Sequence, residues 1–206
     1  KERVWKGKQE VKDLLLDFIA TEPNEKKDTI MEVSVWKALF RKKVFDEYDI
    51  SFVSERQFIS EDVIFDIDYL SKCNCVVAIP EPVYFYCVNP NSLSKVFRTD
   101  RFNKVKKLYK EIIKKLIPIY GEEVSNRRGD RFLIARARTN ARQIIRHEKI
   151  IGKNKMMKAL HNICEDQDMN EIFQRYPIHL LPLKYRLVAY LMKYRCYHLL
   201  KIILGR

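Results

Sequence analysis

Residues 60–79 read SEDVIFDIDYLSKCNCVVAI, and this stretch decides the fold class that the sequence predicts. Ser60 can cap a helix because its hydroxyl accepts a backbone N–H group, and Glu61 and Asp62 would then lie at the positive end of the helix dipole. That position favours an ionised Asp62 by lowering its pKa. The apolar run Cys75–Ile79 predicts a buried strand directly after the helix. A helix followed by a buried strand indicates an α/β arrangement.

Further elements are predicted on both sides of this stretch. Apolar residues at helical spacing predict a helix over residues 10–20 and another over about 34–43, and residues 50–52 read as a short extended piece. Downstream, Val83–Val88 reads as a second strand that carries Tyr84 and Tyr86 on one face. After residue 100 the pattern is helical, and Pro118 and Gly121 are expected to end the first of these helices. Other helices are predicted over 128–146, 155–163 and, interrupted by prolines, 169–204.

Four short motifs occur in a defined order: SVWKALF at 34–40, ISEDVIF at 59–65, EPVYFY at 81–86 and NSLS at 91–94. Together they resemble the C-terminal portion of bacterial family-2 glycosyltransferases of the GT-A fold, over about residues 10–97. The resemblance implies an α/β fold: the acceptor-side part of a GT-A catalytic domain at residues 1–99, followed by a mostly α-helical, basic extension at 100–206. It also implies that the nucleotide-binding half of the enzyme precedes Lys1, so this chain alone would be catalytically incomplete.

The resemblance assigns roles to individual residues. Asp62 would be the general base and Glu61 would orient the site. The acceptor would be bound by Trp36, Tyr84 and Tyr86, and the donor phosphates by the loop residues Asn91, Ser92 and Ser94. Each assignment has a structural alternative, because acidic residues are common in a first helical turn and aromatic residues at these spacings commonly pack in a core.

The resemblance also implies Mn²⁺ or Mg²⁺ in the complete enzyme, bound by the absent N-terminal half. Asp66 and Asp68 match an Asp-x-Asp metal motif in letters, but inside a helix their carboxylates would lie about 200° apart and could not chelate one ion. The five cysteines are scattered, as expected of reduced thiols. We therefore expect no metal site in this chain.

The charge is divided unevenly along the chain. The net charge is +13, with 15 Lys and Arg against 18 Asp and Glu in residues 1–100 and 25 against 9 in residues 101–206. The basic half predicts an anionic partner: nucleic acid, an acidic membrane leaflet or a phosphorylated ligand. In 128–146 the arginines fall opposite the apolar side, where they would form either a solvated surface or a membrane-facing one: Arg128, Arg131, Arg138, Arg142 and Arg146.

These observations predict the C-terminal portion of an inverting glycosyltransferase that transfers a sugar from a nucleotide-sugar donor to a glycan or lipid-linked acceptor in cell-surface polysaccharide synthesis. We expect a cytoplasmic location, with peripheral attachment at the inner face of the membrane as an option, because no run of about 18 apolar residues is free of charge. Nucleic acid is not expected as a partner. The alternatives are a basic helical module that binds nucleic acid or an anionic membrane without catalysis, and a purely structural interaction module.

Overall fold

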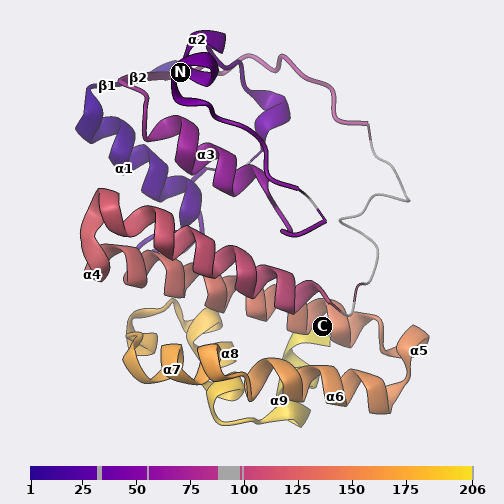
Figure 1. Cartoon of the computed structure of the whole chain (residues 1–206). Helices are drawn as coiled ribbons and strands as arrows, with labels where there is room; N and C mark the ends of the chain where they lie inside the picture. Colours follow the sequence, from indigo (N-terminus) through magenta and orange to yellow (C-terminus); the bar gives the residue numbers. More distant parts are fainter. Residues whose placement is uncertain (32–33, 55, 88–97, 99, 206) are drawn as a thin grey trace.

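A long helical hairpin organises the molecule. The computed structural model describes residues 1–205 apart from 32–33, 55, 88–97 and 99. Helix α4 (Arg101–Arg146) folds back on itself, and its two arms lie between an N-terminal layer and a group of C-terminal helices (Figure 1). The structure is 65% helical, so it is a mostly α-helical protein.

The predicted α/β fold is wrong. Within the described residues, one two-stranded antiparallel sheet forms, in which β1 (Arg3–Lys6) pairs with β2 (Cys75–Ala78). Residues 82–87 have no regular structure, so the second predicted strand does not form there. Strand β2 is not buried as expected, since Val77 is 51% exposed. The short sheet therefore lies at the edge of the N-terminal layer and cannot form the centre of a GT-A domain.

The N-terminal layer consists mainly of short helices. Helix α1 (Lys8–Ile19) confirms the helix predicted over 10–20, and its apolar side is buried. The helix predicted over 34–43 is wrong, because a 3₁₀ turn, η1 (Val35–Lys37), is followed by the separate helix α2 (Lys42–Tyr48).

Helix α3 (Asp62–Leu70) confirms the predicted helix but not its predicted cap. Ser60 has a φ of 61°, in the left-handed region, and no side-chain cap hydrogen bond is made at the start of the helix. The chain enters α3 through this turn. Asp62 therefore occupies the first helical position, and the residues Val63–Ile67 behind it are buried.

The α4 hairpin bends at Gly121, whose φ of 76° and ψ of 169° lie outside the helical region. A positive φ of this kind is accessible to glycine at little cost. This confirms that the first helix after residue 100 ends at Gly121. The arms then run antiparallel, and the Tyr109 hydroxyl donates a hydrogen bond of 2.9 Å to the Asp130 carboxylate. Gly129 lets the arms approach closely, since a Cβ there would lie 2.3 Å from Ile113 Cδ1.

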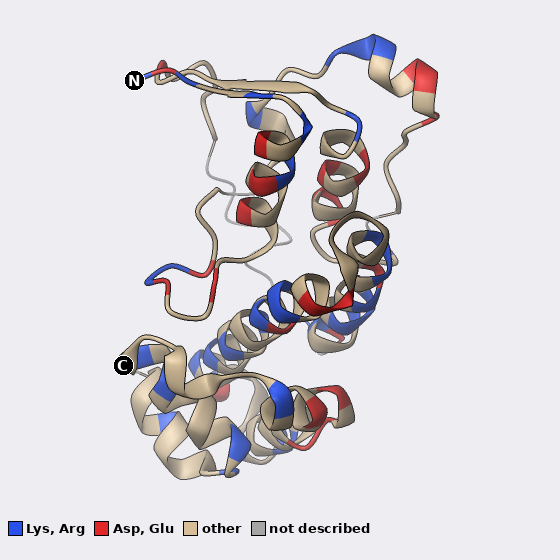
Figure 2. Ribbon diagram, turned by 90° about the vertical axis from the view of Figure 1, so that its left-hand side faces the viewer, with Lys and Arg blue, Asp and Glu red and all other residues tan. Residues whose placement is uncertain are grey.

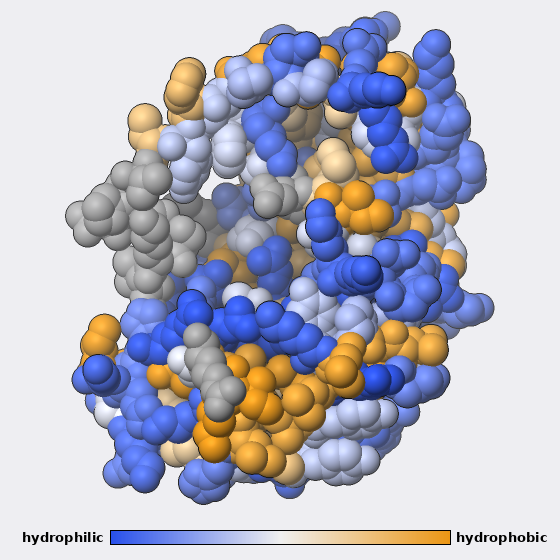
Figure 3. Space-filling model, turned by 180° about the vertical axis from the view of Figure 1, so that it is seen from behind, coloured by the Kyte–Doolittle hydropathy of each residue, from blue (hydrophilic) through white to orange (hydrophobic). Residues whose placement is uncertain are grey.

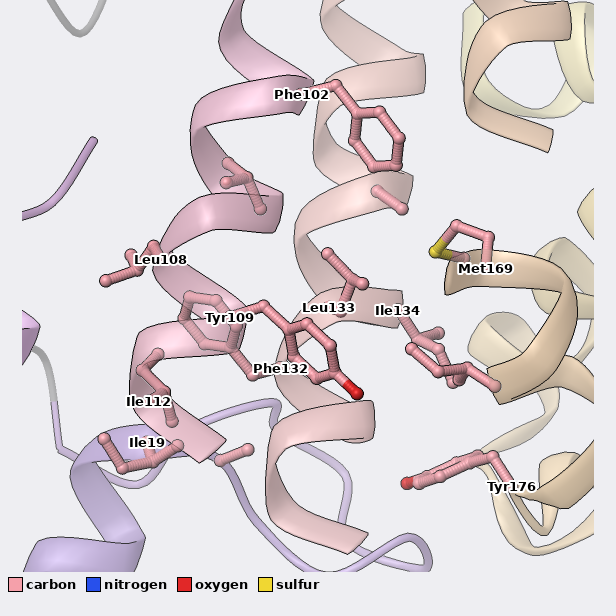
Figure 4. Packing of buried hydrophobic residues seen from close by; sticks show 14 of the residues in the cluster. Ile19, Phe102, Leu108, Tyr109, Ile112, Phe132, Leu133, Ile134, Met169 and Tyr176 are labelled. Carbon is pink, nitrogen blue, oxygen red and sulfur yellow. The ribbon is translucent and has the colours of Figure 1, made fainter. Parts of the chain in front are cut away.

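The C-terminal helices cover the other side of the hairpin. They are α5 (Glu148–Ile151), α6 (Lys153–Cys164), α7 (Gln167–Arg175), η2 (Ile178–Leu180), α8 (Leu183–Lys193) and α9 (Tyr197–Gly205). Ile134 points from the second arm of α4 toward the helices that carry Met169 and Tyr176, while Leu108 and Ile112 lie on the side of Ile19 (Figure 4). One hydrophobic core therefore extends through the hairpin into both layers.

No helix within the described residues has the length and apolar character needed to cross a bilayer.

Candidate functional site

Three aromatic residues that the resemblance assigned to the acceptor lie together. The ring centroid of Trp36 in η1 is 4.7 Å from that of Tyr84 and 5.2 Å from that of Tyr86. All three side chains are about half exposed, so they do not belong to the buried core. An exposed indole flanked by two phenol rings presents apolar faces and polar edges, a combination that suits a sugar ring.

The aromatic cluster opens onto a cavity of about 440 Å³. Trp36 and Tyr86 form one wall, and the second arm of α4 forms the opposite wall with Phe132, Arg136 and Thr139. The molecule is visibly hollowed between its N-terminal layer and the helices below (Figure 3). The volume is large enough for a small ligand, because ligand pockets commonly measure 300–1,000 Å³.

Asp62 does not line this cavity, but Arg136, which does, acts on its charge. The side chain of Asp62 is partly exposed, and within the described residues it forms no ion pair shorter than 4 Å. Burial and the nearby charge of Glu61 raise the pKa of Asp62, while backbone N–H groups and the positive charge of Arg136 oppose that rise. The expectation of a lowered pKa is therefore wrong, because desolvation outweighs the helix terminus. A carboxylate with a raised pKa is a stronger base.

A second carboxylate lies one helical turn further along α3. Asp66 is 5% exposed, and its Oδ2 atom is buried without a hydrogen-bond partner among the described residues. Burial, followed by the charge of Asp62, raises its pKa to about 7, and Lys37 opposes the rise. Asp68 is directed elsewhere and pairs with Lys115 at 2.7 Å. Asp62 and Asp66 thus form a pair of carboxylates that holds a proton more readily than either would in water.

Arg136 connects the carboxylate to the aromatic cavity. It lines the cavity, and it is the cation that acts most strongly on Asp62. Its guanidinium group lies 5.1 Å from the Phe132 ring centroid and has no carboxylate within 4 Å among the described residues. Burial and the charge of Arg101 lower the pKa of Arg136. A desolvated guanidinium without an ion pair is well suited to bind an anionic or hydroxyl-rich ligand.

The remaining predicted catalytic and donor residues are placed only in part. Glu61 precedes α3 and affects Asp62 through its charge. The predicted donor-phosphate residues Asn91, Ser92 and Ser94 lie outside the residues that the structure describes.

The predicted membrane-facing arginine surface is wrong for its central members. Arg131 is 1% exposed and Arg138 is 9% exposed, so neither can reach a membrane. Both pair with Asp28, and Arg128 pairs with Glu22 at 3.0 Å. Arg142 is only partly exposed and Arg146 is exposed, at the end of the helix. The alternative of a solvated surface fails for the same buried residues.

These arginines hold the segment 20–28 against the second arm of α4. Arg131 donates hydrogen bonds to the carbonyl oxygens of Glu25 and Lys27, at 3.2 and 3.4 Å, and Arg128 donates one of 2.6 Å to the Ala20 carbonyl. Lys and Arg residues follow the hairpin along its length (Figure 2). Many of these charges are therefore compensated within the fold.

The described residues do not fit the divalent ion that the resemblance implies. They contain no group of three or more His, Cys, Asp or Glu side chains that could hold a metal. Two of the α3 carboxylates each have a cation acting on them, Arg136 on Asp62 and Lys37 on Asp66. We therefore derive no chemical step through a metal on this chain.

Sequence reasoning missed two residues of this site. Asp66 could have been found from its spacing, because residues four apart share a helix face and Asp62 was already singled out. Arg136 gives no comparable signal, because its partners lie about 70 and 100 residues away in the sequence. Only the fold brings it to Trp36 and Asp62.

No protein-family model matches the chain, and neither a curated protein nor a solved structure gives a significant match to it.

Proposed function

We propose that the site between η1, α3 and α4 binds a sugar acceptor and activates one of its hydroxyl groups for inverting transfer from a nucleotide-sugar donor. One observation carries this proposal: the half-exposed cluster of Trp36, Tyr84 and Tyr86 opens onto a cavity whose opposite wall, Arg136, is also the cation at Asp62. The acceptor would be a glycan or a lipid-linked sugar of a cell-surface polysaccharide.

Asp62 would accept the proton of the acceptor hydroxyl while that oxygen attacks the anomeric carbon of the donor. The bond between the anomeric carbon and the nucleoside diphosphate breaks on the opposite face, which inverts the configuration. The raised pKa of Asp62 favours proton acceptance, and a positioned base contributes about 10²–10⁴-fold to the rate. Trp36 would orient the ring of the acceptor. No site for the donor or for Mn²⁺ or Mg²⁺ is assigned within the described residues.

Asp62→Asn tests the base. We expect turnover to fall about 100-fold or more, while the thermal melting curve stays nearly unchanged. Asp46→Asn is the control, because Asp46 is an exposed carboxylate on α2 that pairs with Lys42 of the same helix. Turnover is measured by nucleoside diphosphate release over a panel of nucleotide sugars. Near-normal turnover of Asp62→Asn would remove Asp62 from this role.

Trp36→Ala tests the acceptor wall. Residues 1–206 carry the aromatic cluster, so acceptor binding can be measured on this chain by calorimetry with oligosaccharides. We expect affinity to fall about tenfold, as loss of an aromatic contact of 1–1.5 kcal/mol predicts. Phe85→Ala is the matched control, since Phe85 lies between the two tyrosines and is 94% exposed. Equal effects of the two variants would argue against a specific wall.

We propose peripheral attachment to an anionic membrane as a second function, through the C-terminal helices and not through the arginines of α4. Four large apolar side chains on α8 and α9 are 46–72% exposed: Leu183, Leu187, Leu199 and Ile202. Exposed Lys184 and Arg195 lie in and after the same helix α8. An apolar area is also visible on the lower part of the surface (Figure 3). Apolar and basic side chains together favour binding at the surface of an anionic bilayer.

Vesicle sedimentation tests this attachment. Binding should be stronger to vesicles that contain phosphatidylserine than to neutral ones, and Leu183→Ser with Ile202→Ser should reduce it. Leu39→Ser is the control, because Leu39 is fully exposed but lies in the N-terminal layer. A nucleic-acid gel shift at the same salt concentration, without vesicle binding, would instead favour the nucleic-acid alternative.

A further inference from the structure

A second cavity, which we call the basic cavity, lies between the two ends of the α4 hairpin and helices α5 and α6. Its volume is about 500 Å³. Among the described residues, four cationic ones and no carboxylate line it: Arg98, Arg101, Lys155 and Lys158. Side-chain amides from Asn103, Gln143 and Asn162 lie among these charges. The lining is therefore suited to an anion with several acceptor oxygens.

Apolar side chains also line the basic cavity. Phe102 and Ile144 come from the two arms of α4, Ile151 from α5 and Ile163 from α6. Ile150, which is 79% exposed, also lines the cavity. A ligand that fills this space must carry an apolar part as well as a negative charge. Neither inorganic phosphate nor a sugar alone meets both conditions.

Arg101 is the residue that most clearly lacks a partner. Its Nη1 atom is buried without a hydrogen-bond partner, and within the described residues it has no carboxylate within 4 Å. Burial and the charge of Arg98 lower the pKa of Arg101. The nearby carboxylate Asp100 pairs with Arg98 and Lys104 instead, both at 3.2 Å. A phosphate oxygen would supply the missing acceptor and offset the repulsion between the arginines.

The basic cavity also leads toward the proposed catalytic site. Arg101 and Asn140 line it, and both also line a small void that Ser60 and Arg136 share. Arg136 is in turn the cation at Asp62. A headgroup at Arg101 would therefore lie on the side of the cavity nearest the site.

We propose that the basic cavity binds an amphiphile with one apolar chain and a phosphate or diphosphate headgroup, with the headgroup at Arg101 and the chain along Phe102 and Ile144. The concave apolar wall favours a single chain over a flat bilayer surface. A nucleic acid would leave that wall unused. The identification of this amphiphile as the carrier of the sugar acceptor rests on the proposed function, whereas binding itself does not.

Calorimetry on residues 1–206 tests the proposal with farnesyl phosphate as the probe, below its aggregation concentration. Inorganic phosphate and farnesol should each bind at least tenfold more weakly, since each lacks one half of the required chemistry. Arg101→Gln with Lys158→Gln should weaken farnesyl phosphate binding at least tenfold. Lys107→Gln with Lys114→Gln removes the same charge from exposed positions on α4 and should change it less than twofold.

Three results would overturn the proposal. Equal affinity for inorganic phosphate would indicate a free-phosphate site, equal effects of the two double variants would indicate general attraction, and displacement by a single-stranded oligonucleotide would indicate a nucleic-acid site. Because no donor is present, failure here leaves the role of Asp62 intact. Conversely, if the chain binds farnesyl phosphate but the Asp62→Asn variant keeps its turnover, the proposed ligand of the basic cavity stands and the proposed role of Asp62 as the base is wrong.

Discussion

Two groups of arginines on α4 differ in their surroundings. Arg131 and Arg138 are buried against the segment 20–28, where Asp28 pairs with both. Arg101 and Arg136 are partly buried, yet neither has a carboxylate within 4 Å among the described residues. The same side chain on one helix thus stabilises the fold in the first group and remains available to a ligand in the second.

The largest expected effect comes from the first group. Arg131→Met should lower the free energy of unfolding by about 3–5 kcal/mol, because it breaks a buried ion pair and leaves carbonyl oxygens of the segment 20–28 without donors. Urea denaturation measures this loss. Arg146→Met, at an exposed position, should change the stability by less than about 0.5 kcal/mol. A loss below about 1 kcal/mol for Arg131→Met would remove the distinction between the two groups.

The carboxylates show the same contrast, since Asp28 has two arginine partners whereas Asp66 Oδ2 has none. Burial raises the pKa of Asp66 from 3.8 to about 7, so the folded protein retains a proton that the unfolded chain releases. The contribution of Asp66 to the free energy of unfolding should therefore decrease between about pH 4 and pH 7, on the order of 4 kcal/mol, and stay level above that range.

Asp66→Asn should remove this dependence and make the protein more stable than the wild type at pH 8 but not at pH 4. Urea midpoints across this range measure it. Asp68→Asn, on the same helix, should leave the slope in place. If the free energy of unfolding of Asp66→Asn changes with pH as steeply as that of the wild type, another group is responsible for the titration.

A smaller effect on stability is expected for Arg136→Met, about 1 kcal/mol or less, because no ion pair is broken within the described structure. The pKa of Asp62 should instead rise further, since the positive charge of Arg136 lowers it. A carboxyl titration followed by NMR on residues 1–206 measures the change. The acidic limb of the pH–rate profile should move to higher pH as well. If the pKa of Asp62 is unchanged in Arg136→Met, Arg136 lies too far from Asp62 to belong to the proposed site.

Arg101→Met should have the smallest effect on the fold. Its buried Nη1 atom has no partner to lose, so the free energy of unfolding should change by less than about 0.5 kcal/mol or increase slightly. Thermal melts at low salt measure this difference. A loss of 2 kcal/mol or more would show that Arg101 belongs to the structural group.

Local patterns in the sequence predicted several helices, although the one predicted over 34–43 is wrong. The apolar spacing before residue 20 and after residue 60 corresponds to α1 and α3, and Gly121 ends the first arm of the hairpin as expected. The strands failed because an apolar run does not reveal its pairing partner. Cys75–Ala78 pairs only with Arg3–Lys6 in the described structure, and residues 82–87 remain irregular.

The candidate site was predictable only where short motifs pointed to its residues. The motif at 34–40 and the tyrosines at 84 and 86 identified a cluster that the structure brings together. The arginine face was misread because helical periodicity shows which residues share a side but not what covers that side. Glu22 and Asp28, about 100 residues earlier, turn that face into an interior.

The hairpin bend at Gly121 has a consequence for how the molecule opens. The two arms of α4 contact α1 and α3 on one side and α6, α7 and α9 on the other, so neither layer can separate without exposing the same apolar surface. Unfolding should thus be a single cooperative transition despite the uneven charge of the two halves. In native-state hydrogen exchange, the slowest amides should cluster in the second arm, around Leu133 and Ala137, at the free energy of global unfolding.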